Sequence, residues 1–259
     1  MNAELQIAID AATQAAAAIR QIWDQENAWV VDKEGGKGPL TQADLAADAI
    51  IQDCLKTAFP SDAILSEETT DDPSRLGRSR VWIIDPVDGT REFVERVPEF
   101  VVSVGLVIDG VAMLGVLLNP ITGELMTGVV GQGATYNGSP ASVTDRRSLA
   151  GARVVVSRSE TQKGWFDHWA SDVNLEPVGS VAYKLGLVGT GQADATFTPK
   201  PRSEWDVCAG AAIIAAAGGR ATDGSDIPYR FNRTPPLHQG VVGTNGHLHA
   251  AIMALIDKA

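Results

Sequence analysis

The chain has 259 residues, which is enough for one large domain or for two smaller domains that share a cleft. Hydrophobic residues make up 44% and charged residues 20% of the sequence, an ordinary globular balance that gives no sign of a fibrous chain. The net charge of −11 argues against a nucleic-acid polymer as a partner, because phosphate backbones are bound by clustered Lys and Arg. A small phosphorylated ligand stays open, since bound cations can invert the field of an acidic cleft, although the acidity could serve solubility alone.

The cysteines and the N-terminal segment indicate in which cellular compartment the protein is expected. Cys54 and Cys208, the only cysteines, both lie in apolar, helical-looking runs, which favours two buried free thiols in a reducing compartment. The N-terminal segment carries Glu4 and Asp10 in an amphipathic pattern, unlike a signal peptide. No apolar stretch reaches the length of a membrane span. We therefore expect a cytoplasmic protein without a membrane partner.

The first half of the chain predicts two helices followed by a sheet. Thr41 is expected to cap the second helix, and Pro60 to end it. Alternating apolar residues punctuated by turn residues predict a meander of antiparallel strands after residue 100. The predicted elements are a helix at 4–26, a glycine-rich loop at 32–39, a helix at 41–59, strands at 63–65 and 81–84 around a polar loop at 66–79, and the meander at 100–130.

The second half alternates strands and helices. An alanine-rich helix is expected to end at the glycine pair Gly218 and Gly219. The predicted elements are a strand at 153–157, helices at 160–170 and 180–190, a strand at 193–197, the alanine-rich helix at 206–219, a strand at 241–245 and a helix at 247–259. We therefore predict an α+β half at 1–146 packed against an α/β half at 147–259.

The segment Val-Trp-Ile-Ile-Asp-Pro-Val-Asp-Gly-Thr carries the clearest chemical signal. A hydrophobic strand delivers Asp85 and Asp88 into a turn that Pro86 and Gly89 favour. Two acids at a buried strand end are costly to desolvate without a cation, and Mg²⁺ accepts such oxygen ligands. The turn also leaves the N–H groups of Gly89 and Thr90 available to an anionic oxygen. An isolated Asp-x-x-Asp is common in surface turns, but the preceding strand and the following Gly-Thr make a metal site the favoured interpretation.

Two further acidic positions follow the same logic more weakly. Glu67 and Glu68 come directly after a short apolar strand, where a solvated loop is the alternative interpretation. Asp206 follows Trp205 and opens the alanine-rich helix, where simple helix capping is the alternative.

The combination of these motifs resembles the inositol monophosphatase superfamily of lithium-sensitive sugar and nucleotide phosphatases. The resemblance extends from the helix start at Thr41–Asp44 to the glycine pair that ends the alanine-rich helix. It implies a layered αβαβα fold, with an antiparallel-sheet N-terminal half, a mixed-sheet C-terminal half and the site in the cleft between them. It also implies two or three Mg²⁺ ions and hydrolysis of a small phosphorylated metabolite by a monomer or homodimer.

The resemblance assigns roles to individual residues. The implied metal ligands are Glu67, Asp85, Asp88, Asp206 and the carbonyl oxygen of Val87. Thr90 would orient the attacking water while Asp44 holds its hydroxyl, so that both count with Glu67 as catalytic residues. The amides of Gly89 and Thr90 would bind the phosphate. Glu68 would support the ligands, and Lys37 lies in a loop that closes over the site in the family.

Weaker marks concern the substrate. The run Arg91-Glu92-Phe93 resembles the 3'(2'),5'-bisphosphate nucleotidase branch, as do the segments 156–159 and 203–206. This implies hydrolysis of adenosine 3',5'-bisphosphate to AMP and phosphate, with inositol monophosphatase activity as the alternative. The implied substrate contacts are Gly89, Thr90, Ser157, Arg158, Ser180, Lys184 and Glu204. The segment 179–184 departs from the branch by an extra residue and by Tyr183. A catalytically silent binding module is disfavoured, because every implied metal carboxylate is present.

Overall fold

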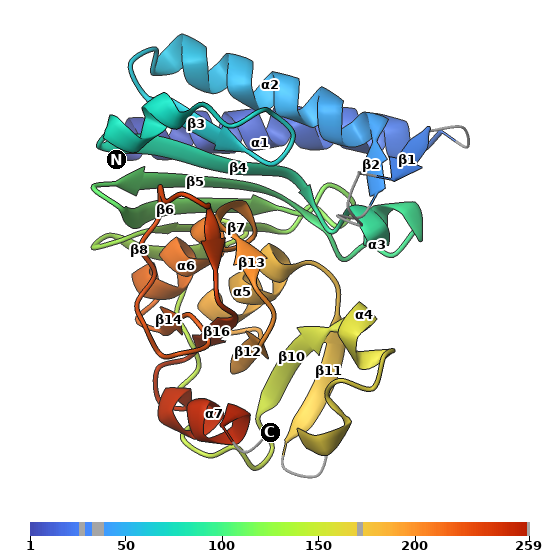
Figure 1. Cartoon of the computed structure of the whole chain (residues 1–259), viewed down its shortest axis with the longest axis vertical. Coiled ribbons are helices and arrows are strands. Elements are labelled where there is room, and N and C mark those ends of the chain that lie inside the picture. The colour runs from blue at the N-terminus through green and yellow to red at the C-terminus, as the bar shows by residue number, and fades with distance from the viewer. Residues whose placement is uncertain (26–28, 33–38, 170–172, 258–259) are drawn as a thin grey trace.

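The computed structural model describes residues 1–25, 29–32, 39–169 and 173–257, and its elements are shown in Figure 1. The α-helices are α1 (Asn2–Trp23), α2 (Gln42–Ala58), α3 (Thr90–Val94), α4 (Arg158–Thr161), α5 (Val181–Gly189), α6 (Glu204–Ala216) and α7 (His249–Ile256). The strands are β1 (Val30–Asp32), β2 (Pro39–Thr41), β3 (Ala63–Ser66), β4 (Arg80–Asp88), β5 (Val101–Ile108), β6 (Val111–Leu118), β7 (Leu125–Val129), β8 (Gly133–Tyr136), β9 (Ser139–Ala141), β10 (Arg153–Ser157), β11 (Asn174–Val178), β12 (Ala195–Thr198), β13 (Arg202–Ser203), β14 (Arg220–Thr222), β15 (Leu237–His238) and β16 (Val241–Thr244). Among the described helices, none is both long and apolar enough to cross a membrane.

The first sheet has the strand order β3-β4-β5-β6-β7-β8-β9. Its neighbouring strands are antiparallel, as the meander predicted, except that β3 and β4 run parallel. Alternate residues of β4 serve two cores, because side chains along a strand point to opposite faces. Trp82 and Ile84 pack with α1 and α2, whereas Ile83 packs with α5 and α6 on the other face.

The second sheet has the order β11-β10-β12-β16-β14 and is mixed, as expected. Strand β10 is parallel to β11 and β12, while β16 is antiparallel to both of its neighbours. Along β10, Val155 joins the core around α5 and α6, and Val154 and Val156 join the outer core with Ile252 of α7. The layers are therefore helix pair, sheet, helix pair, sheet and outer helices, which confirms the αβαβα architecture (Figure 1).

A row of glycines sets the distance between the first sheet and α6. Gly105, Gly115 and Gly128 lie side by side on β5, β6 and β7. A Cβ atom on Gly105 would come 2.6 Å from Cys208 Sγ, and one on Gly128 would come 2.7 Å from Ile213 Cα. Because the row carries no side chains, α6 packs directly on the sheet and brings its first turn to the end of β4.

Replacement of Gly115 by alanine is expected to destabilise the protein. The new methyl group would collide with the carbonyl oxygen of Ala209 in α6, and a backbone atom cannot rotate away. Overpacking of this kind costs about 1–3 kcal/mol, or roughly 2–4 °C in Tm per kcal/mol for a chain of this size. Thermal unfolding of Gly115→Ala should be compared with that of Gly77→Ala, whose added Cβ meets no atom within 4 Å. Equal melting temperatures of the two variants would contradict the close contact.

The structure differs from the sequence expectations at several elements. The predicted helix at 160–170 is instead the short α4 and a 3₁₀ turn at Asp167–Trp169, because Gly164 takes a left-handed backbone with φ 73°. Both cysteines are free, but Cys54 is only half-buried. The strand predicted at 81–84 continues as β4 to Asp88. The division at residue 146 stays a prediction, and α6 from the second stretch of chain covers the sheet of the first.

Candidate active site

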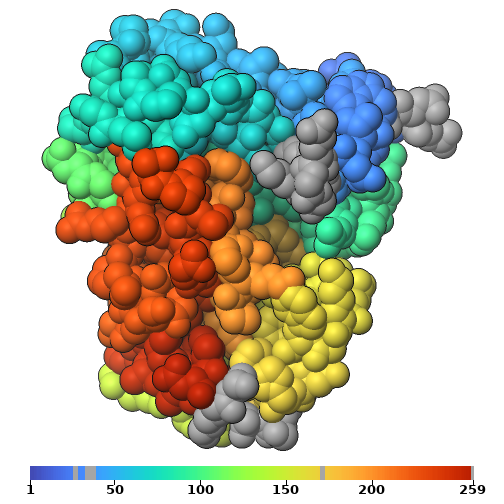
Figure 2. All heavy atoms as spheres, viewed as in Figure 1, coloured from blue at the N-terminus to red at the C-terminus, as the bar shows by residue number. Residues whose placement is uncertain are grey.

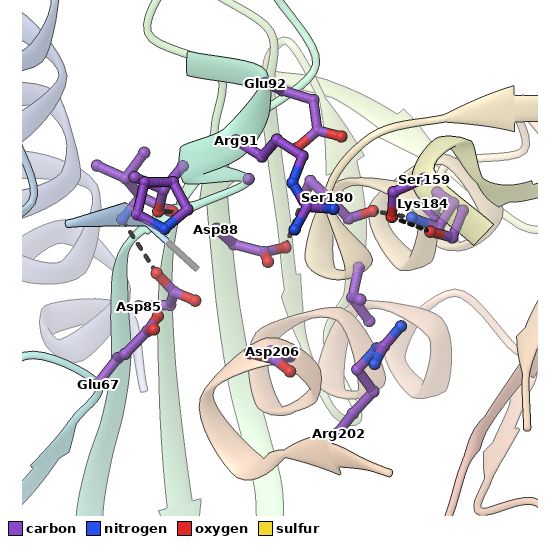
Figure 3. Close-up of a pocket in the computed structure, with 16 residues that line it drawn as sticks. Glu67, Asp85, Asp88, Arg91, Glu92, Ser159, Ser180, Lys184, Arg202 and Asp206 are labelled. Carbon is purple, nitrogen blue, oxygen red and sulfur yellow. Dashed lines mark hydrogen bonds between the residues drawn. The ribbon is translucent and has the colours of Figure 1, made fainter. Parts of the chain in front are cut away.

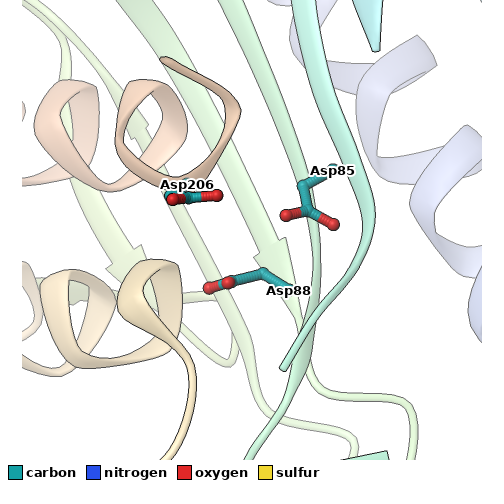
Figure 4. A group of neighbouring side chains, drawn as sticks. All are labelled: Asp85, Asp88 and Asp206. Carbon is teal, nitrogen blue, oxygen red and sulfur yellow. The ribbon is translucent and has the colours of Figure 1, made fainter. Parts of the chain in front are cut away.

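Strand β4 places two buried carboxylates at its C-terminal end. Asp85 is 1% and Asp88 7% exposed. The pairing of β4 with β5 shifts in register between these residues, so that Asp85 and Asp88 turn toward the same side (Figure 4). Asp85 Oδ1 accepts a hydrogen bond from the amide of Val87 at 3.0 Å, while Asp88 Oδ2 accepts from Ser180 Oγ and from the amide of Ala182 at 2.5 Å. The start of α5 is thereby tied to the end of β4.

A third carboxylate comes from the first turn of α6. Asp206 forms a capping box with Ser203, whose amide donates to Asp206 Oδ2 at 3.1 Å. One oxygen from each of Asp85, Asp88 and Asp206 lies within 4.8 Å of the others (Figure 4). The Asp206 side chain therefore caps α6 and also belongs to the carboxylate cluster.

The electrostatics of this cluster call for a cation. Burial, together with the charges of Glu67, Asp88 and Asp206, raises the pKa of Asp85 well above its usual value. Burial and the charges of Asp88 and Glu67 raise the pKa of Asp206 well above its usual value, and burial raises that of Asp88. A cluster of oxygen ligands that repel one another fits a hard divalent cation such as Mg²⁺, which would remove the repulsion.

Magnesium is expected to raise Tm, and to raise it more at high pH. The metal-free fold holds the three aspartates at raised pKa values, so its own stability increases as the pH falls through those values toward the unfolded pKa. Stabilisation by the cation needs ionised carboxylates, is complete above the raised pKa values, and is lost as the pH falls through them. Mg²⁺ at about a hundred times its Kd should add about 2.7 kcal/mol, or roughly 5–10 °C. Scanning fluorimetry with Mg²⁺ and with chelator should show a shift that shrinks as the pH is lowered toward the ordinary pKa of aspartate, about 4, and a pH-independent shift would contradict binding at this cluster.

A hydroxyl network lies behind the carboxylates. Thr90 Oγ1 is 3.0 Å from Asp44 Oδ1 and 3.0 Å from the carbonyl oxygen of Val87. The other oxygen of Asp44 accepts from the amide of Thr41 at 2.8 Å and from its hydroxyl at 2.5 Å, which completes the capping box of α2. The buried Asp44 is thus fixed by its own helix, and it orients the Thr90 hydroxyl.

Gly89 makes the turn between β4 and α3. Its φ of 105° lies in the left-handed region, and a Cβ atom would come 2.8 Å from Phe100 Cβ. Only glycine fits both the backbone and the space. This turn places Gly89 and Thr90 directly after the carboxylates of β4, in the lining of the same cavity.

These groups open into one cavity of about 250 Å³ (Figure 3), which in the space-filling view is a recess between the orange and yellow parts of the chain (Figure 2). Most of the residues predicted from the sequence line it: Glu67, Asp85, Val87, Asp88, Gly89, Thr90, Ser157, Ser180, Lys184 and Asp206. The sequence model of the inositol monophosphatase family matches residues 1–259. The chain belongs to this family.

Relatives support the assignment over the whole chain. Inositol monophosphatase 1 of Solanum lycopersicum is 34% identical over 271 residues, which cover 98% of this chain and 94% of the relative. A histidinol-phosphatase of Chlorobaculum parvum is 31% identical over 263 residues, covering 100% and 98%. The crystal structure of CysQ from Bacteroides thetaiotaomicron superposes with a TM-score of 0.78 at 29% identity, covering 94% and 97%. The protein is therefore a phosphatase of the inositol monophosphatase family, a phosphoric monoester hydrolase that acts on small phosphorylated substrates.

Three residues predicted for this family site lie away from the cavity wall. Asp44 stands behind Thr90. Arg158 Nη2 pairs with Glu99 Oε1 at 2.6 Å and also donates to the carbonyl of Pro177. Glu204 is fully buried and accepts from the amides of Asn232 and Arg233 at 2.7 and 2.8 Å, so its carboxylate fastens that loop to α6.

On the opposite wall, α5 supplies Lys184, and Ser180 caps the start of that helix. The Lys184 ammonium is buried and donates to the carbonyls of Val178, Gly179 and Ser180, and burial lowers its pKa to about 8. Tyr183 points elsewhere, since its hydroxyl donates to Glu124 Oε2 at 2.8 Å and the residue does not line the cavity. The Tyr183 side chain therefore forms no part of the cavity wall.

Four charged or hydroxyl-bearing lining residues have no role assigned from the sequence: Arg91, Glu92, Ser159 and Arg202. Arg91 and Glu92 belong to the run Arg91-Glu92-Phe93, which by itself indicates only a resemblance to the nucleotidase branch. Arg202 precedes the Ser-Glu-Trp-Asp segment, and a cation so close to a metal-ligand candidate was the available signal. Lys37 lies outside the described residues, and Glu68 does not line the cavity.

Proposed function

We propose that this phosphatase is magnesium-dependent and removes the 3'-phosphate of adenosine 3',5'-bisphosphate, giving AMP and phosphate. The observation that carries the proposal is the convergence of Asp85, Asp88 and Asp206 in the wall of a cavity that Arg91 and Arg202 also line. The carboxylates suit the cations that would face the reacting phosphate, and the arginines suit a substrate with further negative charge.

The proposed metal ligands are Glu67, Asp85, Asp88 and Asp206, with the carbonyl oxygen of Val87. All five residues line the cavity, and their donors are oxygens, which suits Mg²⁺. Bound Mg²⁺ would supply a lowered pKa for a water molecule and offset the negative charge that gathers on the phosphate oxygens. Asp88 also holds Ser180 and the start of α5, so the ligand and the substrate-facing wall would keep their relative positions.

Thr90 is the proposed positioning group for the attacking water, and Asp44 orients it. When the Thr90 hydroxyl donates its single proton to Asp44, its oxygen lone pairs remain able to accept a proton from water. A water that donates to Thr90 turns its own lone pair away from Thr90 and toward the cavity, where the phosphorus would lie. The amides of Gly89 and Thr90 are the proposed donors to the phosphate oxygens.

The remaining residues proposed for substrate binding fall into two groups, those that line the cavity and those that hold the backbone around it. Ser157, Ser180 and Lys184 line the cavity and would face the nucleoside or its phosphates. Arg158 and Glu204 would act through the backbone that they hold, as positioning residues. Inositol monophosphatase activity is the second candidate function, because a plant relative of that name is 34% identical over nearly the whole chain.

The proposal is tested by phosphate release from adenosine 3',5'-bisphosphate and from inositol 1-phosphate, measured side by side with Mg²⁺ and with chelator. The expected result is a metal-dependent reaction with the higher kcat/KM for the nucleotide. A higher kcat/KM for inositol 1-phosphate would overturn the nucleotidase assignment in favour of the second candidate. Release that survives full chelation would overturn the metal-dependent mechanism.

A further inference from the structure

Arg202 points into the cavity and is held there by a buried acid (Figure 3). Its Nη2 donates to Glu160 Oε1 at 2.5 Å. Glu160 is only 4% exposed, and its second oxygen accepts from Thr198 Oγ1 at 2.9 Å. The carboxylate is therefore fixed on its far side, so that it orients the guanidinium before any substrate arrives.

The guanidinium retains donors for a ligand. An arginine carries five N–H groups, and the hydrogen bonds of Arg202 go to Glu160 and, from Nη1, to the carbonyl of Pro201 at 3.2 Å. Its Nε is shielded from solvent and has no hydrogen-bond partner among the described residues. The donors open to a ligand are instead the second N–H groups of Nη1 and Nη2, because the Arg202 side chain is 20% exposed and lines the cavity.

The other cations near the site are less suited to this role. The Lys184 ammonium already donates to three backbone carbonyls. Arg158 is paired with Glu99 and does not line the cavity. Arg91 lines the cavity but is exposed, and within the described part of the chain no hydrogen bond or ion pair orients its guanidinium. Of these three cations and Arg202, only Arg202 both lines the cavity and is held by a carboxylate.

We propose that Arg202 forms a second anion subsite, separate from the metal carboxylates, which binds a second phosphate of the substrate and so selects bisphosphates over monophosphates. This inference rests on the proposed nucleotidase function. The rigid, planar guanidinium suits bidentate contact with a phosphate, which a lysine would contact only as a point charge. Ser157 and Ser159, whose hydroxyl oxygens are 3.2 Å apart in the same cavity, supply neutral donors nearby.

The test compares adenosine 3',5'-bisphosphate with adenosine 3'-monophosphate, which has the same scissile phosphate and lacks the second one. In the Arg202→Gln variant, the ratio of kcat/KM between the two nucleotides should fall about 10- to 100-fold, as expected for a lost charge-assisted contact. The loss should reside mainly in KM for the bisphosphate, because the contact is remote from the reacting phosphorus. A ratio within about threefold of the wild type would overturn the proposal.

Two further variants keep this outcome interpretable. Arg202→Gln leaves Glu160 buried without its cation, so the double variant Arg202→Gln/Glu160→Gln restores a neutral pair and should show the same fall in ratio. Arg153→Gln is the matched control. Arg153 also pairs with a glutamate, at 2.7 Å, but it begins β10, whereas the cavity lies at the Ser157 end of that strand. The proposal is also overturned if Arg91→Gln or Arg158→Gln lowers the ratio and Arg202→Gln does not.

The wild-type enzyme separates this inference from the proposed function. A preference for inositol 1-phosphate over the bisphosphate would overturn the nucleotidase assignment whatever the variants show. If the wild type released no phosphate from either nucleotide, the same ratio would be taken from their inhibition constants against inositol 1-phosphate. Weaker binding raises an inhibition constant, so a rise in the bisphosphate-to-monophosphate ratio of inhibition constants in Arg202→Gln would support the subsite, and an unaltered ratio would overturn it.

Discussion

Replacement of Asp88 by asparagine is expected to lower kcat for phosphate release by about a thousandfold or more, because it removes one charge from the proposed metal ligands. The fold should survive. An asparagine oxygen can still accept from Ser180 and Ala182, and the change relieves repulsion within a cluster whose pKa values are raised. We therefore expect the metal-free variant to melt no lower than the metal-free wild type, and to show little stabilisation by Mg²⁺.

Asp194→Asn serves as the control for loss of a buried carboxylate. Asp194 is 5% exposed and pairs with Arg146 at 3.2 Å, away from the cavity. Its replacement should lower Tm while the folded fraction keeps its kcat and its response to Mg²⁺. Wild-type turnover in Asp88→Asn, with an undiminished Mg²⁺ shift, would remove Asp88 from the set of metal ligands.

Thr90→Ala should lower kcat about 100- to 1,000-fold with a smaller effect on KM, since it removes the group proposed to orient the attacking water. Thr90→Ser should keep most of the activity because it retains the hydroxyl near Asp44. Asp44→Asn should resemble Thr90→Ala, because an asparagine NH₂ can donate to Thr90 Oγ1 and occupy the lone pair that the water needs.

Asp44→Asn also weakens the cap of α2, so its kinetics have to be read beside its stability. Loss of a capping interaction costs about 1 kcal/mol. For Thr90→Ala, a suitable control is Thr127→Ala, which also removes a threonine hydroxyl. Thr127 is buried, and its hydroxyl lies 2.8 Å from that of Thr135, in the sheet and outside the cavity. A Thr90→Ala variant with kcat near the wild type and a raised KM would assign Thr90 to phosphate binding instead.

Local patterns were sufficient where the physical cause is local. The carboxylates at the end of β4, the cap at Thr41 and the end of α6 before Gly218 all depend on residues a few positions apart. Such features follow from strand alternation, from side-chain capping and from the left-handed backbone that glycine permits. The layered architecture could be predicted because the motifs resemble those of a family.

Tertiary structure decided which side chains share the cavity. Arg158 and Arg202 are both arginines next to serines, and no local rule separates them. Packing gives Arg158 to Glu99 and aims Arg202, held by Glu160, at the cavity. The helix expected at 160–170 failed for a local reason instead, because Gly164 in its middle takes a left-handed turn that interrupts a helix.

The sequence by itself predicted the acids at the end of β4 and at the start of α6, and the strand and helix that carry them. Only the tertiary structure decided how they meet, because the distance from Asp206 to Asp85 and Asp88 depends on how closely α6 packs on the first sheet. That closeness depends on Gly105, Gly115 and Gly128, which are separated along the chain and become neighbours only through strand pairing. The absence of side chains at these glycines matters only because α6 packs against them, and that packing exists only in the folded layers.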